Sequence, residues 1–223
     1  MGSTKGSFFA AIEAGAADEV RAMVAAEPSL ASARDEQGVS AVMRARYRSD
    51  QALLDAVLSG DPTIDVFEAA SLGDVERLVE WLDADPSSAT AYSADGFTAL
   101  HFPAFFGGTA CVRVLLERGA DVDAYGRGWM TGTPLSSAAA GRHADVARLL
   151  LEGGAAANAR QGSGWTPLHS AAHNGDEEMV MLLLAHGADP AATNDDGATV
   201  LSMAEESGDV KVIAHIRDIL TAS

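Results

Sequence analysis

The chain has 223 residues, 48% of them apolar, and its mean hydropathy of +0.06 is typical of a globular protein rather than a disordered one. Acidic residues outnumber basic ones by 32 to 15, so a net charge of −17 repels phosphate backbones and anionic membrane surfaces. No apolar run approaches the roughly 20 residues of a membrane-spanning helix, so neither nucleic acid nor a membrane is expected as a partner.

The expected compartment is the cytoplasm. The N-terminal segment has a short apolar patch that Glu13 interrupts, which is too short for the core of a secretory signal. The single cysteine, Cys111, excludes an intramolecular disulfide and agrees with a reducing compartment. The excess of arginine over lysine and the abundance of alanine favour a GC-rich bacterial genome.

In chain order, the N-terminal part is predicted to form three irregular helix pairs. Residues 5–34 form an opening pair, in which Phe8 and Phe9 are expected to contact the next one. Residues 35–62 and 63–94 follow, but only 24 residues separate Ser40 from Ile64. The hairpin between these two pairs is therefore expected to be missing or replaced by a short turn at 60–62.

The remaining units, 95–124, 125–159, 160–192 and 193–223, repeat with a regular period. Their landmark residues are Thr98, Thr133, Thr166 and Thr199, which are spaced 35, 33 and 33 residues apart. Apolar stretches keep the same phase at 114–116, 149–151 and 182–184. A fixed period of this length indicates a stack of repeated supersecondary units.

The segment GWTPLHSAAHNGDEEMVMLLLAHGADP, residues 164–190, resembles an ankyrin repeat. The resemblance implies an all-α ankyrin-repeat solenoid, a single domain of about seven stacked helix-turn-helix units with β-hairpin loops over residues 1–223. It also implies a module that binds an unknown protein partner, that is a monomer when free, and that carries no cofactor, metal or catalytic residue. His101 and His169 match the family histidine whose ring bonds backbone across neighbouring turns.

The family binds partners with its hairpin tips and the exposed side of its first helices, on the concave face. Carried over to this sequence, the candidate contacts are Tyr47, Arg48, Phe97, Phe105, Phe106, Trp165, His173 and Asn174. Phe105 and Phe106 are the strongest candidates because exposed aromatic residues concentrate at interface hot spots. The alternative is that Pro103 rotates the helix and turns one of the two into the core. The family pattern does not include Pro103, so the helix there is expected to be distorted or to begin late.

Two further segments carry alternatives that the sequence leaves open. The lengthened hairpin 124–134 places Trp129 and Met130 either at a partner-binding tip or folded back on a neighbouring hairpin. Arg44, Arg46 and Arg48 are predicted to share one edge of a helix. They either contact an anion or acidic peptide, or pair with nearby aspartates.

A second class of function is an enzyme or small-molecule-binding protein with a pocket between the irregular N-terminal units. Against it, most of the histidines occupy repeat landmarks, and no metal-site or phosphate-loop motif occurs. Cys111 falls on an apolar helix face and is expected to be buried and unreactive. A deep enclosed pocket lined by titratable groups near residues 40–70 would favour the enzyme.

Overall fold

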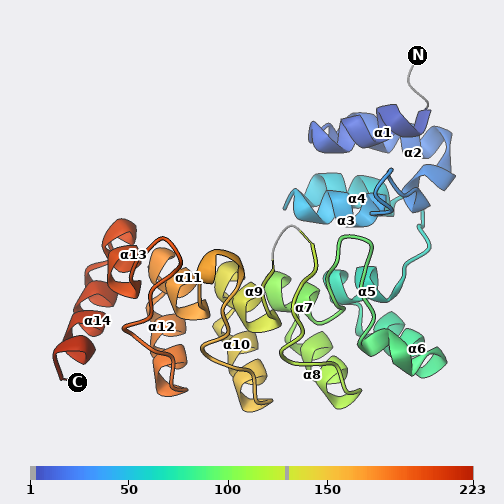
Figure 1. Cartoon of the computed structure of the whole chain (residues 1–223). Helices are drawn as coiled ribbons and strands as arrows, with labels where there is room; N and C mark the ends of the chain where they lie inside the picture. The colour runs from blue at the N-terminus through green and yellow to red at the C-terminus, as the bar shows by residue number, and fades with distance from the viewer. Residues whose placement is uncertain (1–3, 129–130, 223) are drawn as a thin grey trace.

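The computed structural model describes residues 4–128 and 131–222, and within them it contains fourteen α-helices in seven consecutive pairs (Figure 1). No strand forms in these residues; isolated β-bridges occur at Arg34–Ser40, Tyr92–Thr98 and Thr193–Thr199. The predicted all-α solenoid is therefore confirmed, and these three hairpin loops are each closed by a single bridge. We call the projecting loops that precede α3, α7, α9, α11 and α13 fingers.

The first helix of each pair lies in an inner layer and packs on the first helices of its neighbours. The inner helices are α1 (Thr4–Glu13), α3 (Ala41–Tyr47), α5 (Val66–Leu72), α7 (His101–Phe106), α9 (Pro134–Gly141), α11 (Pro167–His173) and α13 (Val200–Ser207).

The second helix of each pair lies in the outer layer. The outer helices are α2 (Ala17–Ala26), α4 (Gln51–Leu58), α6 (Val75–Ala84), α8 (Thr109–Glu117), α10 (Ala144–Glu152), α12 (Glu177–Ala185) and α14 (Val210–Ala222). One continuous apolar core runs between the two layers, from Phe8 to Ile216. None of the helices in the described residues is long and apolar enough to cross a membrane.

The start of α11 shows why the repeated residues form this unit. The Thr166 hydroxyl accepts a hydrogen bond from the His169 backbone N–H, and Pro167 occupies the first helical turn, where its missing N–H costs nothing. In return, His169 Nδ1 accepts from the Thr166 N–H at 3.2 Å, while Nε2 lies 3.3 Å from the Ala198 carbonyl of the next finger. The structural role expected for this histidine is confirmed.

The fourth pair departs from this pattern at Pro103. Helix α7 begins at His101, three residues after Thr98, whereas α9 and α11 begin directly after their threonines. Proline has no N–H to donate to the carbonyl of Ala99, so a helix beginning at Ala99 would lack one backbone hydrogen bond in its first turn. The sequence allowed either a distorted helix or a late start, and the structure shows the late start.

The repeat is interrupted between the second and third pairs. Residues 59–65 connect α4 to α5 without a finger, as the short spacing predicted. The outer helices α4 and α6 also lack the packing that joins the other neighbouring outer helices. As a result, the row α5–α14 runs in one direction, and the block α1–α4 lies above its α5 end (Figure 1).

Candidate functional site

The missing finger brings the second and fourth pairs into direct contact. The fingers at 33–40 and 91–98 meet where a third would stand, so that a Cβ built on Gly38 would lie 3.2 Å from the Ala94 Cβ. The Tyr47 hydroxyl, at the end of α3, donates to the Asp95 carboxylate at the tip of the other finger. In a regular solenoid each unit contacts only its neighbours, so this bond skips a unit.

A second contact across the same gap joins α3 to α7. The Arg46 guanidinium carbon lies 4.1 Å from the centre of the Phe106 ring, a cation–π geometry, and its Nε donates to the Ser71 carbonyl at 3.0 Å. The Tyr47 and Phe106 ring centres are 6.4 Å apart. Arg46 therefore bonds α5 while it packs against α7, which fixes three inner helices relative to one another.

These contacts enclose a cavity of about 330 Å³ that opens on the inner layer; we call it the corner cavity. Its lining comes from the second, fourth and fifth pairs, and consists of Gln37, Val39, Arg44, Tyr47, Asp95, Phe97, His101, Phe102, Phe105, Phe106 and Ser137. Phe105 stands at its mouth with 36% of its surface exposed, and its ring meets Phe106 edge-on at 5.1 Å. The walls are thus mainly aromatic.

Electrostatics keep the tyrosine in its hydrogen-donating form. Burial, followed by the adjacent Asp95 carboxylate, raises the pKa of Tyr47 far above its ordinary value. Asp95 also accepts a hydrogen bond from the Ser93 hydroxyl of its own finger. The carboxylate is therefore held by two hydroxyl donors, one from each side of the gap.

Two family models match the chain: ankyrin repeats in three copies over residues 66–161, and a single ankyrin repeat over residues 163–195. Together the matches cover more than half of the chain. The chain is an ankyrin-repeat protein. Ankyrin repeats are, as a class, protein–protein interaction modules, so the coarse prediction of a protein-binding scaffold agrees with the family.

The chain is also similar to a curated protein, the probable E3 ubiquitin-protein ligase XBOS31 of Oryza sativa subsp. japonica. It is 43% identical over 94 residues, which are 41% of this chain and 20% of that protein. The chain therefore spans about a fifth of the length of the curated relative that it matches.

The three phenylalanines of the fourth pair that were predicted as partner contacts differ in exposure. Phe105 is exposed and Phe106 is half-buried, but only 5% of the Phe97 surface is exposed. The expectation that Phe97 is a surface contact is wrong, because its ring packs edge-on against Phe102 at 6.1 Å and only borders the cavity. The late start of α7 places Phe102 and Phe97 together in the core.

The arginine interpretation also needs correction, because the three side chains do not share one edge of α3. Arg44 forms an ion pair with Asp35 in its own finger, as the surface-pairing alternative predicted, while Arg46 turns toward α5 and α7. Arg48 is exposed near Gly15 and does not line the corner cavity. Residues two apart on a helix lie on nearly opposite sides, so the alternation separates Arg46 from the other two.

Trp165, His173 and Asn174 form a separate surface on the sixth pair, with α9 between them and α7. The Trp165 and His173 rings meet at 5.9 Å, and the Asn174 amide donates to the Ala139 carbonyl at 3.2 Å. They do not contribute to the corner cavity. The predicted contacts Trp129 and Met130 lie outside the described residues.

The described part of the lengthened finger rests on the finger before it. The Arg127 guanidinium carbon lies 3.7 Å from the centre of the Tyr92 ring, and the Tyr92 hydroxyl donates to the Tyr125 carbonyl at 3.1 Å. The Arg127 N–H donates to the Gly96 carbonyl at 2.7 Å. A Cβ on Gly96 would approach the backbone N of Gly128 to 2.6 Å, which explains the glycine.

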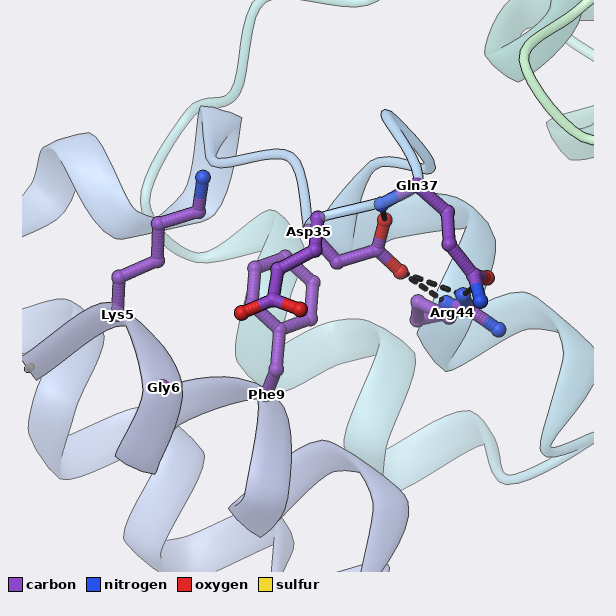
Figure 2. Close-up of a pocket in the computed structure, with 7 residues that line it drawn as sticks. Lys5, Gly6, Phe9, Asp35, Gln37 and Arg44 are labelled. Atoms are coloured by element: carbon purple, nitrogen blue, oxygen red, sulfur yellow. Dashed lines mark hydrogen bonds and ion pairs between the residues drawn. The ribbon is translucent and has the colours of Figure 1, made fainter. Parts of the chain in front are cut away.

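Two further depressions bear on the enzyme alternative. One, of about 490 Å³, lies between α1 and the first finger, where Lys5 and Phe9 face Asp35, Gln37 and Arg44 (Figure 2). Burial acts to raise the pKa of Asp35, but the hydrogen bonds from Arg44 and from the backbone outweigh it and lower that pKa. Two of the charges there, those of Asp35 and Arg44, are thus engaged with each other.

The other depression, of about 500 Å³, fills the gap between α4 and α6 and includes the Asp74–Arg77 ion pair. Both are open to solvent rather than deep enclosures. Across residues 4–128 and 131–222, no group of three or more His, Cys, Asp and Glu side chains could hold a metal ion. Cys111 is buried, and burial raises the pKa of its thiol to about 11, so a reactive thiolate is absent at this position at neutral pH.

Proposed function

We propose that this ankyrin-repeat protein binds a partner protein at the corner between α3 and α7, with Phe105 as its principal contact. The observation that carries the proposal is an exposed phenylalanine at the mouth of an aromatic cavity on the inner layer. Interface cores are enriched in aromatic residues and depleted of charge. Helices α7 and α9 carry no charged residue, although the chain as a whole carries a net charge of −17.

The chain provides a matched control in Met181. Its side chain is 44% exposed, comparable to Phe105, but it lies on the outer helix α12, far along the stack from the corner. Both Phe105→Ala and Met181→Ala remove an exposed apolar side chain. Any difference between them in binding reports the location of the interface rather than the general loss of apolar surface.

The test is quantitative affinity capture from the cells that produce the protein, followed by a binding isotherm for each recovered protein. Truncating a central hot-spot residue costs about 2 kcal/mol or more, so Phe105→Ala is expected to weaken binding roughly 30-fold while Met181→Ala leaves it unchanged. Thermal unfolding of both variants checks that the fold is retained. Equal affinity of the wild type and Phe105→Ala for every recovered protein would refute the proposed interface.

We further propose that the repeats number seven and that the chain is a cytoplasmic monomer when free. Seven helix pairs support the count, with the first two pairs and the last pair lying outside the matched residues 66–161 and 163–195. Sedimentation of the purified protein tests the monomer, and imaging of the tagged protein in its own cells tests the compartment.

A further inference from the structure

The polar groups that line the corner cavity are already satisfied within the protein. His101 Nδ1 accepts from the Thr98 N–H at 3.2 Å, and Nε2 lies 3.0 Å from the Gly132 carbonyl, so both ring nitrogens are used. The Ser137 hydroxyl lies 3.4 Å from the Thr133 carbonyl. None of these buried groups is left to bind a ligand.

The charged groups at the rim are engaged in the same way. Arg44 donates to Asp35 and to the Gln37 side chain, each at 2.6 Å, while the Asp95 carboxylate holds the hydroxyls of Tyr47 and Ser93. A charged or strongly polar ligand that entered the cavity would lose its hydration without gaining equivalent partners. An apolar group loses nothing comparable and is removed from water.

The charges around the corner cavity favour neither an anionic nor a cationic ligand. The Arg44–Asp35 pair is neutral as a unit. Arg46 packs on the lining ring of Phe106 without lining the cavity itself, and its charge offsets that of Asp95. Screening limits the influence of the remaining charges to about 8 Å at physiological ionic strength. The net charge of −17 therefore does not turn this cavity into a site for cations.

We propose that the corner cavity is a receptor for one uncharged, bulky side chain of the partner protein, aromatic or leucine-like. The inference rests on the proposed function and specifies what the partner inserts. A dry cavity of roughly 150 Å³ is enough to bind benzene, so a volume of about 330 Å³ admits a large side chain together with adjoining backbone.

The walls are held in place before any ligand enters. The Tyr47–Asp95 hydrogen bond and the packing of Arg46 on Phe106 fix α3 against α7 from opposite sides of the missing finger. A cavity that is already formed costs the ligand little ordering, which is the condition for recognition by shape alone. Tyr47 and Arg46 are therefore positioning residues, and Phe105 and the neighbouring rings are the contacts.

The test uses four blocked amino acids that share one backbone: the N-acetyl amides of phenylalanine, leucine, aspartate and lysine. Each is titrated into the full-length ¹⁵N-labelled protein, and shifts of the amide resonances of Phe97 and Phe105 are followed. The phenylalanine and leucine amides are expected to shift these resonances in a saturable way, and the charged amides are not. Equal responses to charged and apolar amides, or no response up to the solubility limit, would overturn the inference.

Two variants test whether the amide shifts arise from binding in the cavity: one removes part of its wall and the other fills it. Phe105→Ala removes one wall and is expected to weaken binding of the phenylalanine amide roughly threefold or more. Val39→Phe places a ring inside the cavity and is expected to abolish binding, whereas Met181→Ala changes nothing. Unchanged binding by a folded Val39→Phe protein would also overturn the inference.

The outcomes separate the two proposals. If the apolar amides bind at the corner but affinity for the native partner is insensitive to Phe105→Ala, the proposed function fails and the receptor for apolar side chains stands. If the partner depends on Phe105 while the cavity prefers a charged amide, the inference fails and the proposed function stands.

Discussion

The hydrogen bond between Tyr47 and Asp95 should couple two helix pairs that are not neighbours. Solenoid stability is described by intrinsic terms for each unit and interface terms between adjacent ones, so substitutions in the second and fourth pairs should be additive. A double-mutant cycle with Tyr47→Phe and Asp95→Asn measures the departure from additivity. Both substitutions retain the size of the side chain and remove only the donor or the charge.

The expected coupling free energy follows from the surroundings of the Tyr47–Asp95 hydrogen bond. Hydrogen bonds to charged groups contribute roughly 1.5–3 kcal/mol. Asp95 is half-buried and keeps the Ser93 hydroxyl, so it can recover some solvation when Tyr47 is lost. We therefore expect a coupling free energy of about 1 kcal/mol from urea unfolding followed by circular dichroism.

A matched control exists in the last finger, where Asp196 occupies the position of Asp95 but is exposed and separated from Tyr47 by several units. The cycle of Tyr47→Phe with Asp196→Asn should be additive within about 0.3–0.5 kcal/mol. If the Asp95 cycle were equally additive, the contact across the missing finger would contribute nothing, and the argument for a cavity held in place would fail.

Three further predictions concern buried ionisable groups. Burial lowers the pKa values of His101 and His169 below the ordinary 6.5. The unfolded chain therefore binds more protons below that pH, and the free energy of unfolding should fall as the pH drops from about 6.5, by up to about 1.4 kcal/mol per pH unit for each histidine. A flat stability profile between pH 6.5 and 5.5 would contradict this. Burial, then the neighbouring Asp65, raises the pKa of Glu68, so its carboxylate opposes folding at neutral pH and Glu68→Gln should leave the urea midpoint unchanged or raised; a clearly lowered midpoint would argue otherwise. With its thiol pKa near 11, Cys111 should react with a thiol reagent at pH 8 only after denaturation, and rapid labelling of the native protein would be inconsistent with its burial.

The regular part of the fold could be predicted because its determinants are local. Thr133 and Thr166 each begin a helix followed directly by proline, and their hydroxyls accept the hydrogen bonds that the sequence pattern implied. His101 retains its bonds to Thr98 and to the next finger even though its helix begins late. Interactions between residues three positions apart are fixed by sequence spacing alone, so the repeat period is enough to predict them.

The candidate site was only partly predictable because its contacts are not local. The sequence singled out Phe105 and Phe106 but left open whether they are exposed, and the structure exposes Phe105; the spacing from Ser40 to Ile64 correctly indicated a missing finger. Its consequence, the meeting of Tyr47 with Asp95, joins residues 48 positions apart and depends on the angle between two blocks of helices. No pattern in a single sequence specifies that angle. One usable signal was an aromatic residue at the end of α3 beside the break in the period.

The loss of one finger affects the two layers in opposite ways. In the outer layer the gap between α4 and α6 stays open, as a depression of about 500 Å³ whose rim includes Arg46 and Leu58. In the inner layer the same gap is closed by side chains, because Tyr47 and Arg46 reach across it to the fourth pair. A solenoid that opens on its outer side and closes on its inner side must bend, and the bend turns α3 toward α7. The apolar corner cavity is thus a consequence of the missing finger, which explains why the strongest candidate for binding lies where the repeat is interrupted.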